Sequence, residues 1–250
     1  MLHSRTKVLP RLFSIFMIFA GTSAFASSMP DLIVRRDMLE KEHYLKDEMF
    51  SASDCDVVES NGEVTPGTHT VLRFTVGTAN VGTAPIAIGN PYNFYDPSAD
   101  PLTQLFEFSP CHGHLHFRHY ARYELLPLFA DGSLGSPIFA AKRGFCMLDT
   151  DRNPKSLGSA LVTRKTYNNC SSNQGISAGW TDTYRYYLQG QYFVVDGLHG
   201  NFVIRITVNP AFTQVSNIEL CPYQDAQGFC HMLPESNYSN NIVNYNVFIP

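Results

Sequence analysis

The sequence predicts an all-β fold, a β-sandwich-like single domain with long loops. Short segments of alternating or continuous apolar residues recur along the chain, and turn-forming Gly, Pro, Asn and Asp residues separate them. Convincing helical periodicity is scarce. A chain of 250 residues is long for one domain and short for two, and all-β sandwiches of this size often form single units.

Each predicted strand rests on its own pattern. Residues 71–76 alternate apolar and polar side chains, and the turn-like residues 80–83 predict a hairpin with 85–88. Residues 37–50 are charged and only loosely periodic, so a helix and an irregular strand both stay open there. The other predicted strands are 30–34, 105–108, 112–116, 120–126, 138–141, 192–195, 202–208 and 242–249. Long loops are predicted at 151–181 and 210–239.

Residues 1–26 have the pattern of a secretory signal peptide. Arg5, Lys7 and Arg11 precede an apolar run at 12–20, and small residues end the segment at 24–26. The run is shorter than the roughly 20 residues that a membrane-spanning helix needs, and no later stretch approaches that length. We therefore expect an exported protein, periplasmic or extracellular, with residues 27–250 as its domain and no transmembrane segment in the mature chain.

The charge balance argues against nucleic acid as a partner. The chain has 18 basic and 22 acidic residues and a net charge of −4, and residues 1–26 hold three of the basic residues and none of the acidic ones. Loss of those three positive charges takes the net charge from −4 to −7. Such a surface repels phosphate and tolerates a cationic amine.

The stretch Cys111-His112-Gly113-His114-Leu115-His116 is the strongest candidate site. Alternate side chains of an extended strand share one face, so His112, His114 and His116 are predicted to point the same way. Neutral imidazole suits zinc and copper, and three such ligands leave coordination positions open. The spacing predicts a metal site without choosing the metal. The plainer interpretation is three polar residues on a solvent-facing strand.

Further motifs follow the histidines. Two of them are Lys142-Arg143-Gly144-Phe145-Cys146 and Gly179-Trp180-Thr181-Asp182-Thr183-Tyr184. Other segments of the same pattern are Pro30-Asp31-Leu32-Ile33-Val34, Gly175-Ile176-Ser177, Val208-Asn209-Pro210 and Pro234-Glu235-Ser236-Asn237-Tyr238-Ser239-Asn240-Asn241. Together these ordered motifs resemble the lysyl oxidase family, the copper amine oxidases that build their own quinone, over most of the mature chain.

The resemblance implies a copper and quinone site surrounded by the long loops. His112, His114 and His116 would be the copper ligands, and Lys142 and Tyr184 would form lysine tyrosylquinone. Formation requires oxidation of the tyrosine ring and addition of the neutral lysine amine to it as a nucleophile. The finished enzyme would convert a primary amine, in this family a protein lysine side chain, to an aldehyde. Dioxygen would be the oxidant, and hydrogen peroxide and ammonia would be released.

Asp182 is the candidate base that removes a proton from the substrate α-carbon. It lies two residues before Tyr184, so the two side chains share a face if the segment is extended. His119 is predicted to lie on the opposite face of a straight strand from His116, with a supporting or structural role. Without the family motifs, Lys142 would be an ordinary solvated lysine and Tyr184 a packing residue.

The resemblance also implies an oxygen-rich cation site. Its residues are Asp31, Leu32 through its carbonyl, Glu235, Asn237, Asn240 and Asn241. Hard oxygen ligands suit calcium, but Asn237 stands where relatives often carry aspartate, which lowers the charge of the site. Calcium binding and a plain Asn-rich turn before the last strand both stay open.

The six cysteines are expected to form disulfides, because an exported chain meets an oxidising compartment. The sequence alone leaves their connectivity open. The family pattern implies three pairs, Cys55–Cys111, Cys146–Cys170 and Cys221–Cys230. Each closure is expected to contribute roughly 2–4 kcal/mol to stability.

Two other functions compete with the amine oxidase. Gly113-His114-Leu115-His116 also has the look of a cupin metal motif, as in a cupin-like or zinc hydrolase site. That motif expects a nearby glutamate, and the nearest, Glu124, lies eight residues beyond His116. An exported Ig-like module that sequesters zinc or copper would keep the histidines without forming a quinone. Substitution of Lys142 separates these functions, because only the oxidase depends on that side chain.

Overall fold

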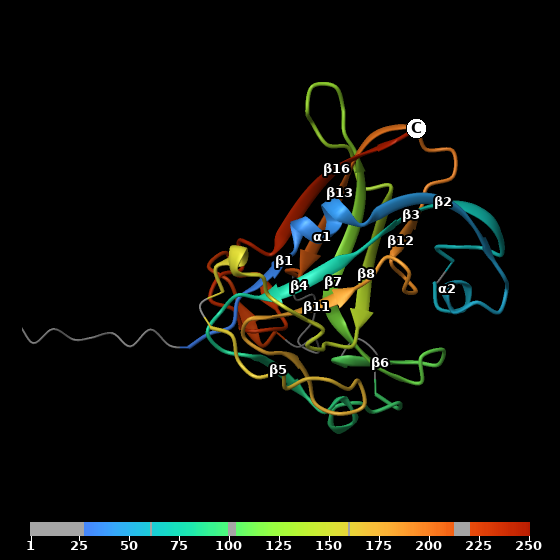
Figure 1. The fold of residues 1–250 in the computed structure, drawn as a ribbon. Helices are drawn as coiled ribbons and strands as arrows, with labels where there is room; N and C mark the ends of the chain where they lie inside the picture. Colours follow the sequence, from blue (N-terminus) through green and yellow to red (C-terminus); the bar gives the residue numbers. More distant parts are fainter. Residues whose placement is uncertain (1–27, 61, 100–103, 160, 213–220) are drawn as a thin grey trace, which may run out of the picture.

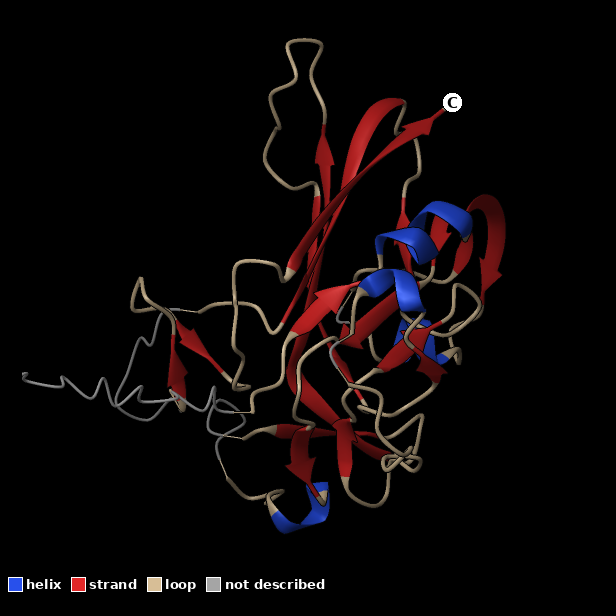
Figure 2. Ribbon diagram, turned by 60° about the vertical axis from the view of Figure 1, so that its left-hand side comes forward, coloured by secondary structure: helices blue, strands red, loops and turns tan. Residues whose placement is uncertain are grey.

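The computed structural model describes residues 28–60, 62–99, 104–159, 161–212 and 221–250, with the backbone alone at 140–143. The predicted signal peptide, residues 1–26, lies outside the described residues. Antiparallel strands dominate and the helices are short (Figure 2), so the all-β prediction is confirmed. The elements are β1 (Leu32–Val34), α1 (Arg36–Lys41), β2 (His43–Phe50), α2 (Cys55–Val58), β3 (Gly67–Phe74), β4 (Val76–Asn80), β5 (Ile86–Gly89), η1 (Pro91–Asn93), β6 (Phe106–Ser109), β7 (His114–Pro127), β8 (Phe139–Phe145), β9 (Asp151–Arg152), η3 (Lys155–Leu157), β10 (Gln174–Ile176), β11 (Trp180–Tyr184), β12 (Tyr192–Val194), β13 (Gly200–Val208), β14 (Tyr223–Gln224), β15 (Cys230–His231) and β16 (Ile242–Ile249).

The long strand β7 is the centre of the largest sheet. It pairs with β13, which in turn pairs with β16, and it also pairs with β6 and β8. Figure 1 shows β16, β13, β7 and β8 running side by side. Large apolar side chains fill the inner positions of β7, and Leu115, Tyr123 and Leu125 are fully buried. The first residues of β7 carry two of the candidate metal ligands, so the centre of the sheet positions the site.

Shorter strands form a second layer against this sheet. They belong to two smaller sheets, ordered β1-β4-β11-β9 and β12-β3-β2, and Figure 1 shows β3, β4 and β11 crossing β7 and β8. Phe74 of β3 meets Tyr123 of β7 with ring centroids 5.4 Å apart. Tyr120 of β7 donates a hydrogen bond to Asp182 of β11 at 3.0 Å. The layers therefore contact face to face, as in a β-sandwich.

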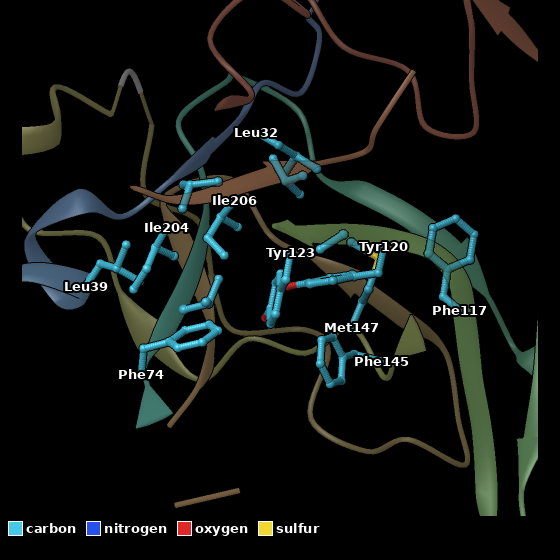
Figure 3. Close-up of a cluster of buried hydrophobic side chains, with 14 of the residues drawn as sticks. Leu32, Leu39, Phe74, Phe117, Tyr120, Tyr123, Phe145, Met147, Ile204 and Ile206 are labelled. Carbon is cyan, nitrogen blue, oxygen red and sulfur yellow. The ribbon is translucent and has the colours of Figure 1, made fainter. Parts of the chain in front are cut away.

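One hydrophobic core fills the space between the layers (Figure 3). Leu32 of β1, Leu39 of α1 and Phe74 of β3 lie opposite Ile204 and Ile206 of β13, and all five are 0% exposed. Burying a side chain of this size contributes about 1.5–3 kcal/mol. The core thus fixes the strands that carry the site residues.

The hairpin predicted between 71–76 and 85–88 is wrong. Residues 71–74 belong to β3, which pairs with β2 and β12. β4, which begins at Val76, pairs with β1 and β11, whereas β5 pairs with β10. The turn after β4 is held by the N-terminal segment, where the amide of Thr83 donates to the carbonyl of Met29 at 2.8 Å. Contacts with a distant part of the chain therefore replace the local pairing that the alternating pattern favours.

Three other segments are more regular than predicted. One is 210–239, predicted as a loop, whose described residues contain β14 and β15, paired with each other. Residues 37–50 resolve into α1 followed by β2, because Leu39 is buried in the core whereas most side chains of β2 stay partly or fully exposed. Residues 151–181 contain β9, β10 and the beginning of β11, so the prediction of one long loop is wrong there. Their partners are β4, β5 and each other, which are too far away in sequence for a local pattern to reveal.

All three predicted disulfides are confirmed. The structure joins Cys55 to Cys111, Cys146 to Cys170 and Cys221 to Cys230. Among the described residues, none of the helices has the length and apolar character required to cross a bilayer.

Candidate functional site

The three histidines come from two kinds of backbone. His114 and His116 occupy one face of β7, as predicted, but His112 lies in the turn between β6 and β7. The prediction that one extended strand carries all three is therefore wrong for His112. Gly113 has φ +68°, a left-handed conformation that glycine adopts readily, and this residue reverses the chain between the two segments. The turn nevertheless places His112 beside His114 and His116.

A carboxylate and a disulfide hold that turn in place. Glu59, at the end of α2, accepts hydrogen bonds from the Ser109 hydroxyl at 2.8 Å and from the Cys111 amide at 2.9 Å. The Ser109 hydroxyl in turn accepts from the His112 amide at 3.1 Å. The Cys55–Cys111 disulfide joins α2 to the residue before His112. The backbone of the turn is thus fixed from two sides.

Three ring nitrogens converge on one point. Nδ1 of His112 and Nε2 of His114 each lie 3.2 Å from Nε2 of His116, and the three donor atoms lie within 4.8 Å of one another. Nδ1 of His114 faces the carbonyl of His112 at 3.0 Å, so it carries the proton and leaves Nε2 free to bind a metal. Nε2 of His112 faces Oε1 of Gln189. Each contact therefore directs one lone pair toward the common point.

The surroundings of His114 and His116 favour the neutral, metal-binding form of these two rings. Burial, together with the positive charges of His114 and His112, lowers the pKa of His116 to about 4. Burial is also the main cause that lowers the pKa of His114. Neutral imidazole is the form that binds zinc or copper, so the site is ready for a metal at neutral pH.

A cleft of about 400 Å³ opens beside the histidines, with His112 and His116 in its wall. Its charged lining residues are Asp56, Glu59, Glu63, Glu107 and Arg118. Burial raises the pKa of Glu107, and Arg118, 3.6 Å away, partly offsets that effect. Among the described lining residues, carboxylates outnumber the guanidinium of Arg118, so these residues attract cations.

His119 lines the cleft with His112 and His116. A β-bulge interrupts β7 around this residue, because Phe117 pairs with Phe145 whereas Ala121 pairs with Arg143. The ring of His119 packs on Phe212, with centroids 5.4 Å apart, which supports the structural role predicted for it.

Tyr184 ends β11 next to the wall of the cleft. Its hydroxyl donates to the carbonyl of Cys146 at 2.5 Å, and its ring lies 4.1 Å from that of Phe145. Phe145 lines the same cleft as His112 and His116, so the ring on which Tyr184 packs forms part of the wall beside the histidines. Burial raises the pKa of Tyr184 well above its usual value, and the nearby Asp182 carboxylate acts in the same direction.

Asp182 is buried two residues earlier on β11. Burial raises its pKa well above the ordinary value, whereas the hydrogen bond from the Tyr120 hydroxyl, 3.0 Å long, lowers it. The ring of Tyr120 lies 6.1 Å from that of Tyr184. A carboxylate with a raised pKa is a stronger base in its ionised form.

Lys142 is placed by its backbone. It lies in β8 opposite Arg122 of β7, three residues before Phe145. β8 therefore carries both Lys142 and the aromatic residue that contacts Tyr184. Glu124, the carboxylate required by the cupin interpretation, lies farther along β7 and pairs with Arg122 at 3.1 Å. Eight residues of strand separate it from His116, about 26 Å at roughly 3.3 Å per residue.

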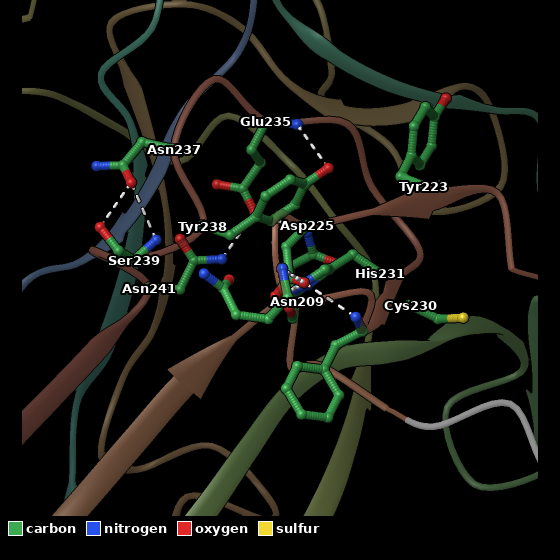
Figure 4. Close-up of polar contacts among 12 residues, drawn as sticks. Asn209, Tyr223, Asp225, Cys230, His231, Glu235, Asn237, Tyr238, Ser239 and Asn241 are labelled. Atoms are coloured by element: carbon green, nitrogen blue, oxygen red, sulfur yellow. Dashed lines mark hydrogen bonds and ion pairs between the residues drawn. The ribbon is translucent and has the colours of Figure 1, made fainter.

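The residues of the expected calcium site form a second polar cluster, and Figure 4 shows Glu235, Asn237 and Asn241 of that cluster. Glu235 accepts from the amide of Leu32 at 2.6 Å and from the side chain of Asn241 at 2.8 Å. Asn240 donates to Asp31 at 3.1 Å. The oxygen of Asn237 instead accepts from the amide and hydroxyl of Ser239.

The electrostatics of this cluster fit a cation-binding site. Burial raises the pKa of Glu235 to about 7 and also raises that of Asp31. In the described part of the protein, the buried Oδ1 atoms of Asn240 and Asn241 accept no hydrogen bond. A bound cation would satisfy both oxygens and favour the charged carboxylates.

Sequence reasoning missed Gln189 and Glu59. Gln189 lies 77 residues from His112, its hydrogen-bond partner, and Glu59 lies 50 residues from Ser109. Neither residue belongs to a motif with the histidines, so the sequence carried no signal for them.

The amino-acid sequence of this chain is similar to those of several known proteins. Protein-lysine 6-oxidase of Gallus gallus is 24% identical over 244 residues, which cover 94% of this chain and 49% of that protein. Lysyl oxidase homolog 2A of Danio rerio is 23% identical over 237 residues, with 90% and 26% covered, and lysyl oxidase homolog 1 of Homo sapiens is 26% identical over 180 residues, with 71% and 24% covered. The chain thus spans about half or less of the length of these curated relatives. The sequence model of the family described as lysyl oxidase matches residues 30–233, which shows that the chain belongs to the lysyl oxidase family.

Proposed function

We propose that this chain is an exported copper-dependent amine oxidase whose quinone forms from Lys142 and Tyr184. The observation that carries the proposal is the convergence of three imidazole nitrogens within 4.8 Å, in a chain that belongs to the lysyl oxidase family. The proposed substrate is a primary amine, with a protein lysine side chain as the principal case. The name of the Gallus gallus relative describes that same activity for that protein.

The residues present fit copper. His112, His114 and His116 offer neutral nitrogen donors, which suit both copper and zinc. Copper and the quinone, when bound, would supply the oxidation of the amine by dioxygen. The reaction removes two electrons and two protons from the C–H and N–H bonds of the amine and gives them to dioxygen. One water supplies the aldehyde oxygen and releases the nitrogen, so an aldehyde, ammonia and hydrogen peroxide result.

The chain's own residues would bind the substrate and move its proton. The carboxylates of the cleft would attract the ammonium form of the amine. Asp182 would accept the α-proton, and the Tyr120 hydroxyl, 3.0 Å from its Oδ2, would hold that carboxylate in position. Phe145 would keep water away from Tyr184, on which it packs.

The experiment is peptide mass mapping of protein produced with copper, together with an assay of hydrogen peroxide release from a simple primary amine. We expect the peptides around Lys142 and Tyr184 to be covalently joined. Tyr184→Phe should fold but release no peroxide. Tyr187→Phe is the matched control, because Tyr187 lies three residues away and is 65% exposed.

Active protein that yields both peptides unlinked would contradict the quinone, and equal activity in Tyr184→Phe would contradict its assignment. The second candidate function is an exported metal-binding protein that forms no quinone. It would predict tight metal binding, unlinked peptides and no effect of Lys142→Arg. A cupin-like or zinc hydrolase activity would likewise survive substitution of Lys142.

We also propose a calcium ion in the cluster of Asp31, Leu32, Glu235, Asn237, Asn240 and Asn241. The two buried amide oxygens without a hydrogen bond support it. Calcium should raise the unfolding temperature relative to chelator-treated protein, and Glu235→Gln should abolish the increase. Asn237→Asp should strengthen binding because it adds a negative charge. An unfolding temperature unchanged by calcium would leave the plain Asn-rich turn as the interpretation.

Export is proposed from the signal-peptide pattern of residues 1–26, with 27–250 as one catalytic domain. Residues 1–26 combine basic residues, an apolar run and small residues before the expected cleavage site. N-terminal sequencing of protein from the periplasm and the medium should find a chain that begins at Ser27. A cytoplasmic chain that retains Met1 would contradict this.

A further inference from the structure

Gln189 connects the candidate metal site to the segment that follows Tyr184. The side-chain oxygen of Gln189 contacts Nε2 of His112, and Gln189 lies in the wall of the same cleft. An amide oxygen can only accept a hydrogen bond, so this contact requires the proton of His112 on Nε2. The lone pair of His112 is then on Nδ1, the atom 3.2 Å from Nε2 of His116.

The segment that carries Gln189, residues 185–190, is itself fixed. Arg73 is 3% exposed and donates from one nitrogen to the carbonyls of Tyr186 at 3.1 Å and Leu188 at 2.9 Å. The amide of Tyr186 donates to the Thr75 hydroxyl at 2.9 Å. These contacts hold the main chain on both sides of Tyr187.

Two further contacts complete the fixation. The amide of Gly190 donates to Asp56 at 2.8 Å, and Glu48 holds Arg73 through two hydrogen bonds of 2.7 and 2.8 Å. The backbone on both sides of Gln189 is therefore anchored to β3 and α2. An acceptor on a fixed backbone can orient the more exposed ring of His112, whose own backbone lies in a turn.

We propose that Gln189 is a positioning residue of the metal site, which holds His112 as the Nε2-protonated tautomer so that Nδ1 is its metal donor. The site would then combine Nδ1 of His112 with Nε2 of His114 and of His116. The main-chain carbonyl of His112 plays the corresponding part for His114. It accepts a hydrogen bond from one ring nitrogen and so leaves the other nitrogen to bind the metal. The inference rests on the metal site of the proposed function, not on the quinone.

The first test uses metal-free protein and histidine ¹⁵N chemical shifts, which distinguish the two tautomers, at a pH near 8 where the rings are neutral. The His112 signals are assigned by their loss in His112→Asn. Wild type should show the Nε2-protonated form. Gln189→Leu should give a mixture of tautomers, and Gln189→Glu should restore the wild-type form because it keeps an oxygen at the same position. Gln227→Leu, at an exposed site, is the matched control.

The second test measures Cu(II) affinity by competition with a chelator. Gln189→Leu should bind roughly 10–100-fold more weakly, the usual loss when the partner of a ligating histidine is removed, and Gln189→Glu should recover most of it. Pulsed EPR of the Cu(II) protein should show a change at one uncoordinated imidazole nitrogen in Gln189→Leu alone. If Gln189 had a purely structural role, Gln189→Leu would lower the unfolding temperature without that spectroscopic change.

The inference is overturned if wild-type His112 carries its proton on Nδ1, or if Gln189→Leu changes neither tautomer nor affinity. Its failure is distinguishable from failure of the proposed function. Protein that binds copper through an oriented His112 but forms no quinone would retain the inference and lose the oxidase.

Discussion

The Cys55–Cys111 disulfide should be the one whose loss damages both stability and metal binding. It closes a segment with a sequence separation of 56, and the chain-entropy relation gives about 4 kcal/mol for a loop of that length. The Cys221–Cys230 disulfide has a separation of 9, for which the same relation gives about 2.5 kcal/mol. The double variant Cys55→Ser/Cys111→Ser should therefore lose about 1.5 kcal/mol more than Cys221→Ser/Cys230→Ser.

Urea unfolding of the metal-free proteins measures these losses, and chelator competition measures Cu(II) affinity. Cys111 precedes His112 directly, and its amide donates to Glu59. The first variant should thus bind Cu(II) at least about tenfold more weakly, whereas the second should bind like wild type. Equal stability losses, or unchanged Cu(II) affinity in the first variant, would refute the reasoning.

Other predictions concern packing and protonation. Gly175→Ala should cost about 1–3 kcal/mol in urea unfolding, because its Cβ would overlap a carbonyl oxygen of β5. Pairing with Asp196 raises the pKa of His69, so the pair stabilises the fold fully below the unfolded pKa of about 6.5 and loses its effect as pH rises through the higher folded value. Asp196→Asn should therefore lose more stability at about pH 5.5 than at about pH 8.5. Tyr120→Phe should raise the pKa of Asp182 further and cost about 1–3 kcal/mol, and an unchanged unfolding midpoint would contradict their hydrogen bond.

Local patterns predicted most strands but not their partners. β13 and β16 follow from alternation and β-branched residues, and both lie where the sequence placed them. The hairpin predicted with β5 failed because Thr83 bonds to Met29, 54 positions away, and a sliding window does not sample that separation. The disulfides were found through the family motifs rather than through spacing.

The candidate site was predictable as a set of ligands but not as a geometry. Alternation placed His114 and His116 on one face, yet it failed at His112, where the positive φ of Gly113 breaks the extended backbone. Gln189 could not be predicted for another reason. Its contact with His112 forms only when the segment after β11 packs beside the start of β7 in the folded protein. The candidate ligands can be identified from one short stretch of sequence, whereas the orientation of their side chains depends on tertiary structure.

The bulge in β7 divides that strand into two independently registered halves. The half that contains Phe117 keeps one alignment with β8, and the half that begins at Ala121 keeps another. A change of one residue at the bulge is therefore expected to shift the histidine end of β7 without shifting the alignment of the buried residues that follow it.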